Sequence, residues 1–306
     1  MRGSSSGAPA CRFRGEADGK IDIAQSAACR HAGGRRPFGR RARRGRGPDA
    51  GTVAGEAGSR QPGEERAGAA LYVANYGPNE LFHNEGHGKF RDVAAQLGVA
   101  GEYHGVSSAW GDYDNDGRPD LYVTAYINGI TRYPDYLYHN DGDHFTEVTP
   151  SVILRHDGDH GVAWADFDLD GALDLALANN EGMGSHYLFR NLLPPERARR
   201  SLQVLVLDEK GHFTKAGAEV RLYRNGTRTL LGTTMVDTGS GYCSQNAMPA
   251  HLGLGSYDGK VDVEVTHMTP GGRQVARIAD VVPREYAGKY LVVKVAAAGK
   301  TTSASK

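Results

Sequence analysis

The sequence predicts an all-β protein in which a partial β-propeller precedes a small β-sandwich-like domain. Three features of the 306 residues favour this fold class: a repeat of about fifty residues built from short strands, two carboxylate-rich loops that join strand to strand, and longer alternating strands after Pro194 and Pro195. The expected divisions are a disordered Gly/Arg-rich tail over 1–68, the repeats over 69–192, the second domain over 200–295 and a flexible tail over 296–306.

The repeat is seen as an apolar segment that recurs about every fifty residues, with a second short strand after each copy. The three copies and their following strands occupy residues 71–76 and 81–84, 121–126 and 137–140, and 175–180 and 188–191. Alternating apolar residues punctuated by Gly, Asn and Asp are typical of short antiparallel strands. The best-defined unit holds the four strands of a propeller blade, at residues 106–110, 121–126, 136–139 and 145–148. A short helix is expected over 92–97.

Two aligned loops gather carboxylates in the pattern D-x-D-x-D-G-x-x-D, and each joins two predicted strands. Their acidic residues are Asp112, Asp114, Asp116 and Asp120 in the first loop, and Asp166, Asp168, Asp170 and Asp174 in the second. Such crowding of negative charge is destabilising unless a hard cation lies among the oxygens, and calcium takes six to eight oxygen ligands. Gly117 and Gly171 allow the sharp backbone turn. An EF-hand would need Glu at the twelfth position, where Val123 and Leu177 stand, so each loop is expected to close on its ninth residue.

The segment from Trp110 to Val123, together with LFHNEGHGKF at residues 81–90, resembles the FG-GAP/VCBS repeat of integrin-type propellers. The resemblance implies blades of four antiparallel strands, with calcium bound between blade strands by the eight aspartates named above. It adds the backbone carbonyls of Arg118 and Ala172, at the seventh position of each loop, as ligands. It also implies an extracellular or periplasmic location, where millimolar calcium would fill even weak sites.

The repeats are too few for a closed propeller. A ring of about seven blades would need more chain than residues 71–191, which supply between two and three blades. An open stack of sheets leaves unpaired strand edges. We therefore expect either further blades in a longer chain or a partner that covers the open edge.

The second domain is predicted from longer alternating strands, at residues 202–208, 218–223, 229–236, 261–266, 274–278 and 290–295. The segments that resemble the ASPIC/UnbV domain are GSGYCSQ at 239–245, HLGLG at 251–255, VDVEV at 261–265 and PGG at 270–272. That domain follows such repeats in the cartilage acidic protein-like family, so the resemblance also implies the order of domains in this chain. His267 departs from the family pattern, which usually has Trp near this turn.

One tetrapeptide of the second domain supports a different function. Asp237, Thr238, Gly239 and Ser240 match the active-site signature of aspartic proteases, in which two aspartates share one proton. A chain with one copy of the signature would have to dimerise. The alternative hypothesis is therefore a dimeric aspartic protease.

Charge is distributed unevenly, although the totals of 36 basic and 36 acidic residues cancel. Residues 71–190 hold 19 of the acidic and 6 of the basic residues, and seven arginines lie between Arg35 and Arg46. No nucleic-acid fold signature accompanies these arginines, so we expect no nucleic-acid partner. No apolar run is long enough to span a membrane, and no apolar region that would mark a signal peptide follows the first basic residues. Cys11, Cys29 and Cys243 predict neither a disulfide framework nor a Cys-based metal site.

Three basic residues occupy equivalent positions in the repeat: His83, His139 and Arg190. Because Arg replaces His in the third copy, we interpret all three as exposed strand positions. A group with the composition of a transition-metal site, or of an ordinary polar turn, is formed by His156, Asp157, Asp159 and His160. Residues 16–23 form a degenerate third loop in which Arg14 stands where the first carboxylate should be.

Together, these patterns predict a calcium-binding, non-enzymatic interaction or adhesion protein, with Ca²⁺ as its cofactor. The ions are expected to be structural first, since each would neutralise four carboxylates and hold two strands together. A protein or glycan partner is expected, but its identity is not readable from the repeats.

Overall fold

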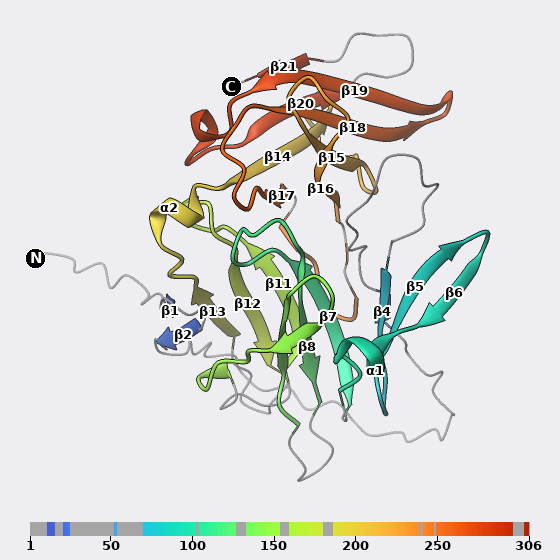
Figure 1. Cartoon of the computed structure of the whole chain (residues 1–306), viewed down its shortest axis with the longest axis vertical. Coiled ribbons are helices and arrows are strands. Elements are labelled where there is room, and N and C mark those ends of the chain that lie inside the picture. The colour runs from blue at the N-terminus through green and yellow to red at the C-terminus, as the bar shows by residue number, and fades with distance from the viewer. Residues whose placement is uncertain are drawn as a thin grey trace, which may run out of the picture.

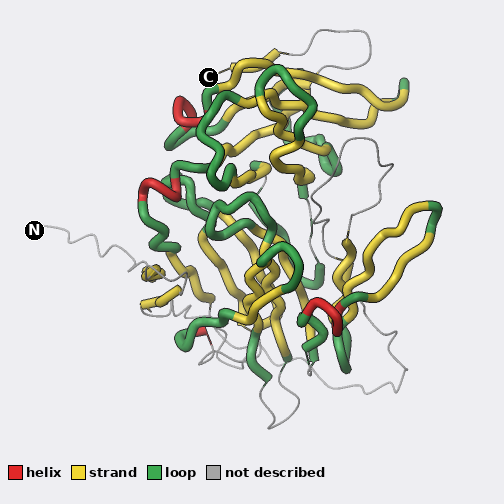
Figure 2. Tube along the Cα trace, viewed as in Figure 1, coloured by secondary structure: helices red, strands yellow, loops and turns green. Residues whose placement is uncertain are grey.

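The computed structural model describes residues 70–101, 104–126, 133–153, 159–179, 186–237, 239, 241–247 and 249–295, and the backbone of four short strands at 11–15, 21–24, 52–53 and 303–305. The described chain is all-β, as predicted, and its helices are single turns (Figure 2). These helices are α1 (Ala94–Leu97), α2 (Pro195–Ala198) and the 3₁₀ turn η2 (Pro283–Tyr286). No helix within the described residues is long and apolar enough to cross a membrane.

Within the described residues, the repeats form three sheets that do not close into a ring (Figure 1). The first sheet contains β3 (Thr52–Val53), β4 (Ala70–Ala74), β5 (Glu80–Gly86) and β6 (Lys89–Asp92). The second contains β7 (Gly105–Gly111), β8 (Asp120–Ala125), β9 (Tyr136–Asn140) and β10 (Phe145–Glu147). The third contains β11 (Asp159–Ala165), β12 (Asp174–Asn179) and β13 (His186–Arg190), extended by β1 (Cys11–Gly15) and β2 (Ile21–Ala24). The strands pair antiparallel except for β1, which pairs in parallel with β13.

Strand β8 explains why these sheets stack face to face. All six of its residues are buried, so both of its faces meet apolar neighbours. Leu121 and Val123 pack into the cluster shared with the first sheet, whereas Tyr122 packs into the cluster that contains Phe189 of the third sheet. The second sheet is therefore sandwiched between two cores, which is the packing of adjacent blades.

The second domain consists of two four-stranded sheets packed around one apolar core. One sheet has the order β17 (Ala250–Gly253), β14 (Ser201–Asp208), β20 (Leu291–Val295) and β21 (Ser303–Ser305). The other has the order β16 (Leu230–Met235), β15 (Glu219–Arg224), β18 (Val261–Thr269) and β19 (Gly272–Val281). Residues that alternate along the strands meet in the core, among them Val204, Val220, Val263 and Val293.

A segment of the second domain lies against the open edge of the repeats. Strand β11 ends the third sheet, and its outward N–H groups are bound by side chains of the segment 241–247. The Val162 N–H donates to Ser244 Oγ at 3.0 Å, and the Trp164 N–H donates to Asn246 Oδ1 at 3.0 Å. The chain thus covers one of its own exposed strand edges.

Candidate metal centre

The two carboxylate loops fold in the same way. Each begins where the first strand of its pair ends, so the first loop joins β7 to β8 and the second joins β11 to β12. The fourth residues, Asn115 and Leu169, have φ angles of 59° and 58°, and the sixth, Gly117 and Gly171, have φ angles of 93° and 97°. Matching left-handed residues at matching positions show that the repeated sequence produces a repeated backbone.

The first carboxylate organises each loop from inside. Asp112 accepts hydrogen bonds from the N–H groups of Asp116 and Gly117 at 3.0 and 2.9 Å. Asp166 accepts the two equivalent bonds at 3.1 and 2.9 Å. These bonds turn the chain so that the loop wraps around its own acidic side chains.

The last carboxylate fixes each loop to the blade. Asp120 is fully buried and accepts from the N–H of Tyr113 at 3.2 Å and from the N–H of Asn140, at the end of β9, at 2.8 Å. Asp174 is held in the same way, by bonds of 3.1 and 2.7 Å. The ninth residue therefore joins its loop to the end of another strand of the same blade, β9 in the first case and β13 in the second.

Carboxylate oxygens converge in both loops to within the dimensions of a cation site. Two sets have one oxygen from each residue within 4.8 Å of the others: Asp112, Asp114 and Asp120, and Asp166, Asp168 and Asp174. The donors are all hard oxygens on a tightly turned backbone, which is the chemistry that calcium prefers. The residues present therefore fit the predicted ion.

Burial makes the negative charge costly in the absence of a cation. Burial, with Asp114 and Asp116 nearby, raises the pKa of Asp112 to about 8. In the second loop, burial raises the pKa of Asp174 to about 8 and that of Asp166 to about 6. A bound divalent cation would act in the opposite direction and favour the ionised forms.

Basic side chains contact the loops at positions that we had predicted to be exposed. His139 Nε2 lies 3.4 Å from Asp114 Oδ2, and Arg190 Nε lies 2.6 Å from Asp168 Oδ2. Both side chains, like that of His83, are only partly exposed, so that prediction was wrong. Each strand directs its basic residue towards the carboxylate loop of its own blade. The repeat alignment contained this signal, because Arg and protonated His both carry a positive charge.

A further arginine reaches the first loop from outside the repeats. The Arg197 guanidinium, on α2, lies 2.8 Å from Asp114 Oδ2 and also donates to the Asp114 carbonyl at 3.0 Å. Burial would raise the pKa of Asp114, but hydrogen bonding to His139 and the charge of Arg197 outweigh burial and lower it. Residues 193–199 lie between the two expected divisions, and nothing in their sequence indicates this contact.

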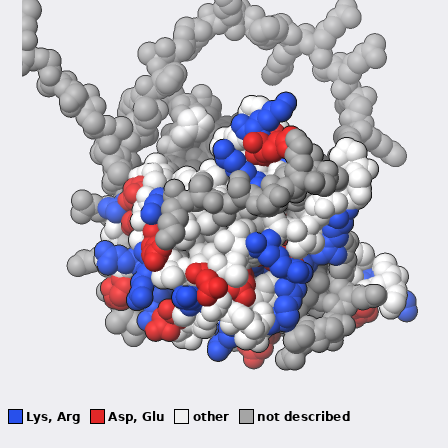
Figure 3. All heavy atoms as spheres, turned by 90° about the horizontal axis from the view of Figure 1, so that it is seen from above, with Lys and Arg blue, Asp and Glu red and all other residues white. Residues whose placement is uncertain are grey.

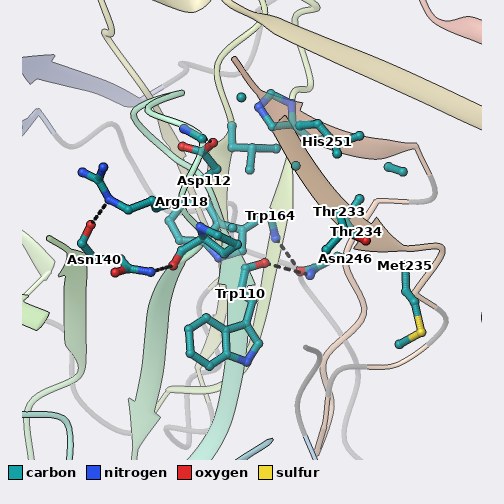
Figure 4. A pocket seen from close by; sticks show the side chains of 18 of the residues that line it. Trp110, Asp112, Arg118, Asn140, Trp164, Thr233, Thr234, Met235, Asn246 and His251 are labelled. Carbon is teal, nitrogen blue, oxygen red and sulfur yellow. Dashed lines mark hydrogen bonds between the residues drawn. The ribbon is translucent and has the colours of Figure 1, made fainter. Parts of the chain in front are cut away.

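The two predicted carbonyl donors lie on the seventh residues of the loops. The Arg118 side chain donates to the Asn140 carbonyl at 2.7 Å (Figure 4). It also pairs with Asp116. Ala172 is fully buried. Their carbonyl groups remain predicted ligands.

The remaining candidates are placed only in part. Asp159 is fully buried, and the His160 ring stacks on Tyr126 with centroids 5.2 Å apart. Cys243 is exposed and free. The residues outside the described part of the chain are His156, Asp157, Thr238, Ser240, Cys29 and the stretches 16–20 and 35–46.

A cavity of about 430 Å³ lies between the first loop and the second domain. Asp112 and His251 lie along it, and Asn246 is bonded to the backbone of both Trp110 and Trp164 (Figure 4). Asp237 also lines this cavity, and its Oδ1 accepts the Gly239 N–H at 2.9 Å.

Comparison with known proteins agrees with this arrangement. Residues 70–123 and 126–177 match the FG-GAP-like repeat, and residues 209–283 match the ASPIC and UnbV domain. The chain belongs to the FG-GAP-like repeat proteins that carry an ASPIC and UnbV domain. The boundary between the two matches falls close to the change of architecture at α2.

The chain is similar to curated proteins from three animals, which share the name Cartilage acidic protein 1. The chain is 30% identical to Cartilage acidic protein 1 of Mus musculus and to that of Homo sapiens, over 66% of its length in each case. It is 28% identical to Cartilage acidic protein 1 of Xenopus tropicalis over 62% of its length. The matched region spans only 39%, 38% and 38% of these relatives.

Proposed function

We propose that this chain is a calcium-binding, non-enzymatic protein of extracellular-matrix type, in which two ions hold the blades in shape. The observation that carries the proposal is the repetition: two loops with matching backbone and matching hydrogen bonds bring hard oxygen donors within 4.8 Å of one another. A single acidic turn could be incidental. Two turns with matching φ angles and matching hydrogen bonds, in adjacent blades, are better explained by a ligand of the same kind in each.

The proposal places the chain outside the cell or in the periplasm. Calcium there is abundant enough to fill loops of millimolar affinity. The curated relatives are named for cartilage, a tissue rich in extracellular matrix. The role that follows is that of a scaffold whose blades are stabilised by ions and whose surfaces bind a protein or a glycan.

The outer face of the second domain is consistent with a mixed polar partner. Figure 3 shows Lys and Arg interspersed with Asp and Glu over much of this face. The described residues of this face therefore give no uniform field for a nucleic acid or an anionic membrane.

Calcium titration calorimetry on the full chain tests the proposal. We expect two bound ions, one of which is lost in Asp116→Asn and the other in Asp170→Asn. Asp143→Asn is the matched control, because this carboxylate is 91% exposed and lies outside the loops. Absence of calcium binding by the wild-type chain would overturn the proposal.

A dimeric aspartic protease remains the second candidate, because Asp237 lines a cavity. The neighbouring residues Ser244 and Asn246 are already engaged in holding β11, which leaves the segment little freedom to close over a substrate. An acid-optimum peptidase activity that Asp237→Asn abolishes would establish the protease, and its absence would exclude it.

A further inference from the structure

We propose that the ASPIC and UnbV domain docks directly on the two carboxylate loops, so that calcium occupancy controls the docking of the domains, with Asn115 as the coupling residue. The inference rests on the proposed calcium binding and adds a partner for the same loops.

Asn115, the fourth residue of the first loop, links three parts of the chain. It is 2% exposed, and its Nδ2 donates to the carbonyl of Gly171 in the second loop at 2.8 Å and to that of Ala198 on α2 at 3.1 Å. Its Oδ1 lies 2.7 Å from Nε2 of His251 on β17. One side chain therefore joins both loops and the second domain.

The backbone of the first loop also meets the second domain at close range. The N–H of Gly255 donates to the Asn115 carbonyl at 2.9 Å. A Cβ at Gly255 would lie 2.6 Å from the Asp116 carbonyl oxygen, and one at Gly253 would overlap the Asp112 carboxylate. The end of β17 and the residues that follow it thus fit against the loop, with no room for a side chain at Gly253 or Gly255.

The second loop meets the same domain through different residues. Ser201 Oγ donates to the Gly171 carbonyl at 2.8 Å, and the Gln203 side-chain amide donates to Asp166. A Cβ at Gly171 would overlap the Ala198 carbonyl. Both loops therefore present their backbone to the start and the edge of one sheet, β14 and β17.

These contacts link ion binding to docking. Without a cation, repulsion among the buried carboxylates opposes the tightly turned loop, and the loop carries Asn115 and the groups that bind the second domain. A ligand that stabilises the turned loop must stabilise whatever binds only that form, and docking must in turn raise the affinity for the ligand.

Hydrogen exchange on the full chain, in calcium and in chelator, measures the docking directly. We expect calcium to slow exchange in residues 252–257 by about tenfold, within the usual range of coupling between sites. Strand β18, in the opposite sheet of the same domain, is the internal reference and should not change.

Asn115→Leu separates docking from ion binding. Leu169 occupies the equivalent position of the second loop with almost the same φ angle, so Leu is compatible with this turn and no predicted ligand is removed. We expect the variant to bind two calcium ions while residues 252–257 exchange at the same rate with and without calcium. Leu169→Ala is the matched control and should behave as the wild type does.

Gly255→Ala provides a second variant, should Asn115→Leu fail to fold. It leaves the loop sequences intact and should likewise bind calcium without slowing exchange. Calcium binding by the wild type with no change in residues 252–257, or an unchanged calcium effect in Asn115→Leu or Gly255→Ala, would overturn the inference and leave the proposed function standing. A wild-type chain that binds no calcium would overturn both.

Discussion

At the scale of the residue, each loop balances crowded carboxylates against a few basic side chains. His139 and Arg190 come from equivalent strands and contact equivalent aspartates, whereas Arg197 reaches only the first loop. The two sites are therefore unequal, because the first shares its oxygens with an additional guanidinium. A cation that binds the first loop has to compete with that group.

Removal of the Arg197 guanidinium should strengthen ion binding at the first loop. In Arg197→Ala, we expect the calcium affinity of that loop to rise severalfold, since an opposing charge 2.8 Å from Asp114 is lost, while the second loop is unchanged. Calorimetric titration measures both sites, and Arg199→Ala is the control on the same helix end. If the first loop binds calcium with the same affinity in the wild type and in Arg197→Ala, the guanidinium does not compete with the ion.

His251 should make the domain contact sensitive to acid. Burial lowers the pKa of His251 to about 4, from an ordinary value of 6.5. The unfolded chain takes up this proton as the pH falls through about 6.5, whereas the folded chain resists until about 4. Titration of His251 therefore leaves the free energy of unfolding unchanged above about pH 6.5. Between about pH 6.5 and pH 4 it lowers the free energy of unfolding by roughly 3 kcal/mol.

Denaturant unfolding at pH 7 and pH 4.5 tests whether His251 lowers the free energy of unfolding as the pH falls. We expect His251→Gln to lose less stability between these pH values than the wild type does. His144→Gln, at a side chain that is 57% exposed, should follow the wild type. An acid loss in His251→Gln as large as that of the wild type would contradict the assignment.

At the scale of the element, the contact between adjacent blades depends on aromatic packing behind the loops. The Trp164 ring on β11 stacks against Tyr113, with centroids 6.4 Å apart, and meets the Tyr122 ring edge-on at 6.3 Å. Its Nε1 donates to the Ala109 carbonyl on β7 at 3.2 Å. Strands from two blades thus share one indole, directly beside the start of both loops.

Truncation of this indole should separate the blades. Trp164→Ala is expected to cost about 3–5 kcal/mol, because it leaves a large cavity and an unsatisfied carbonyl in the interface. Phe167→Ala, nearby in the second loop but 41% exposed, should cost less than about 1 kcal/mol. Chemical denaturation compares the two, and similar losses would mean that the blades do not depend on this contact.

At the scale of the whole molecule, the sequence predicted what repeats and missed what spans the two domains. The strands lie close to their predicted ranges because alternation and turn residues determine them locally. Strand β17 was missed because it is only four residues long and ends at a glycine, and α2 because it is a single turn in the stretch 193–199 that the expected divisions left unassigned. The role of Asn115 was invisible, since the aligned position is Leu169 and its partners lie more than fifty residues away.

The edge of strand β11 is a second contact between the two domains that the sequence did not predict. The further blades or partner that the sequence predicts for the open sheets stay a prediction. The edge of β11, by contrast, is bound by the chain's own segment 241–247, which the sequence did not indicate. Nothing local in that segment marks it as an edge cover. Ser244 and Asn246 reach the N–H groups of β11 only when the second domain is docked on the repeats.

The most direct test of the account is thermal unfolding of the full chain in calcium and in chelator, with the double variant Asp116→Asn, Asp170→Asn. We predict that calcium at about a hundred times its Kd adds about 2.7 kcal/mol per site, so that the midpoint rises by several degrees in the wild type and not in the double variant. The control, Asp143→Asn with Asp280→Asn, removes the same charge from exposed positions and should keep the rise. An equal midpoint in calcium and chelator for the wild type, or an equal rise in the double variant, would contradict the claim that these loops bind calcium.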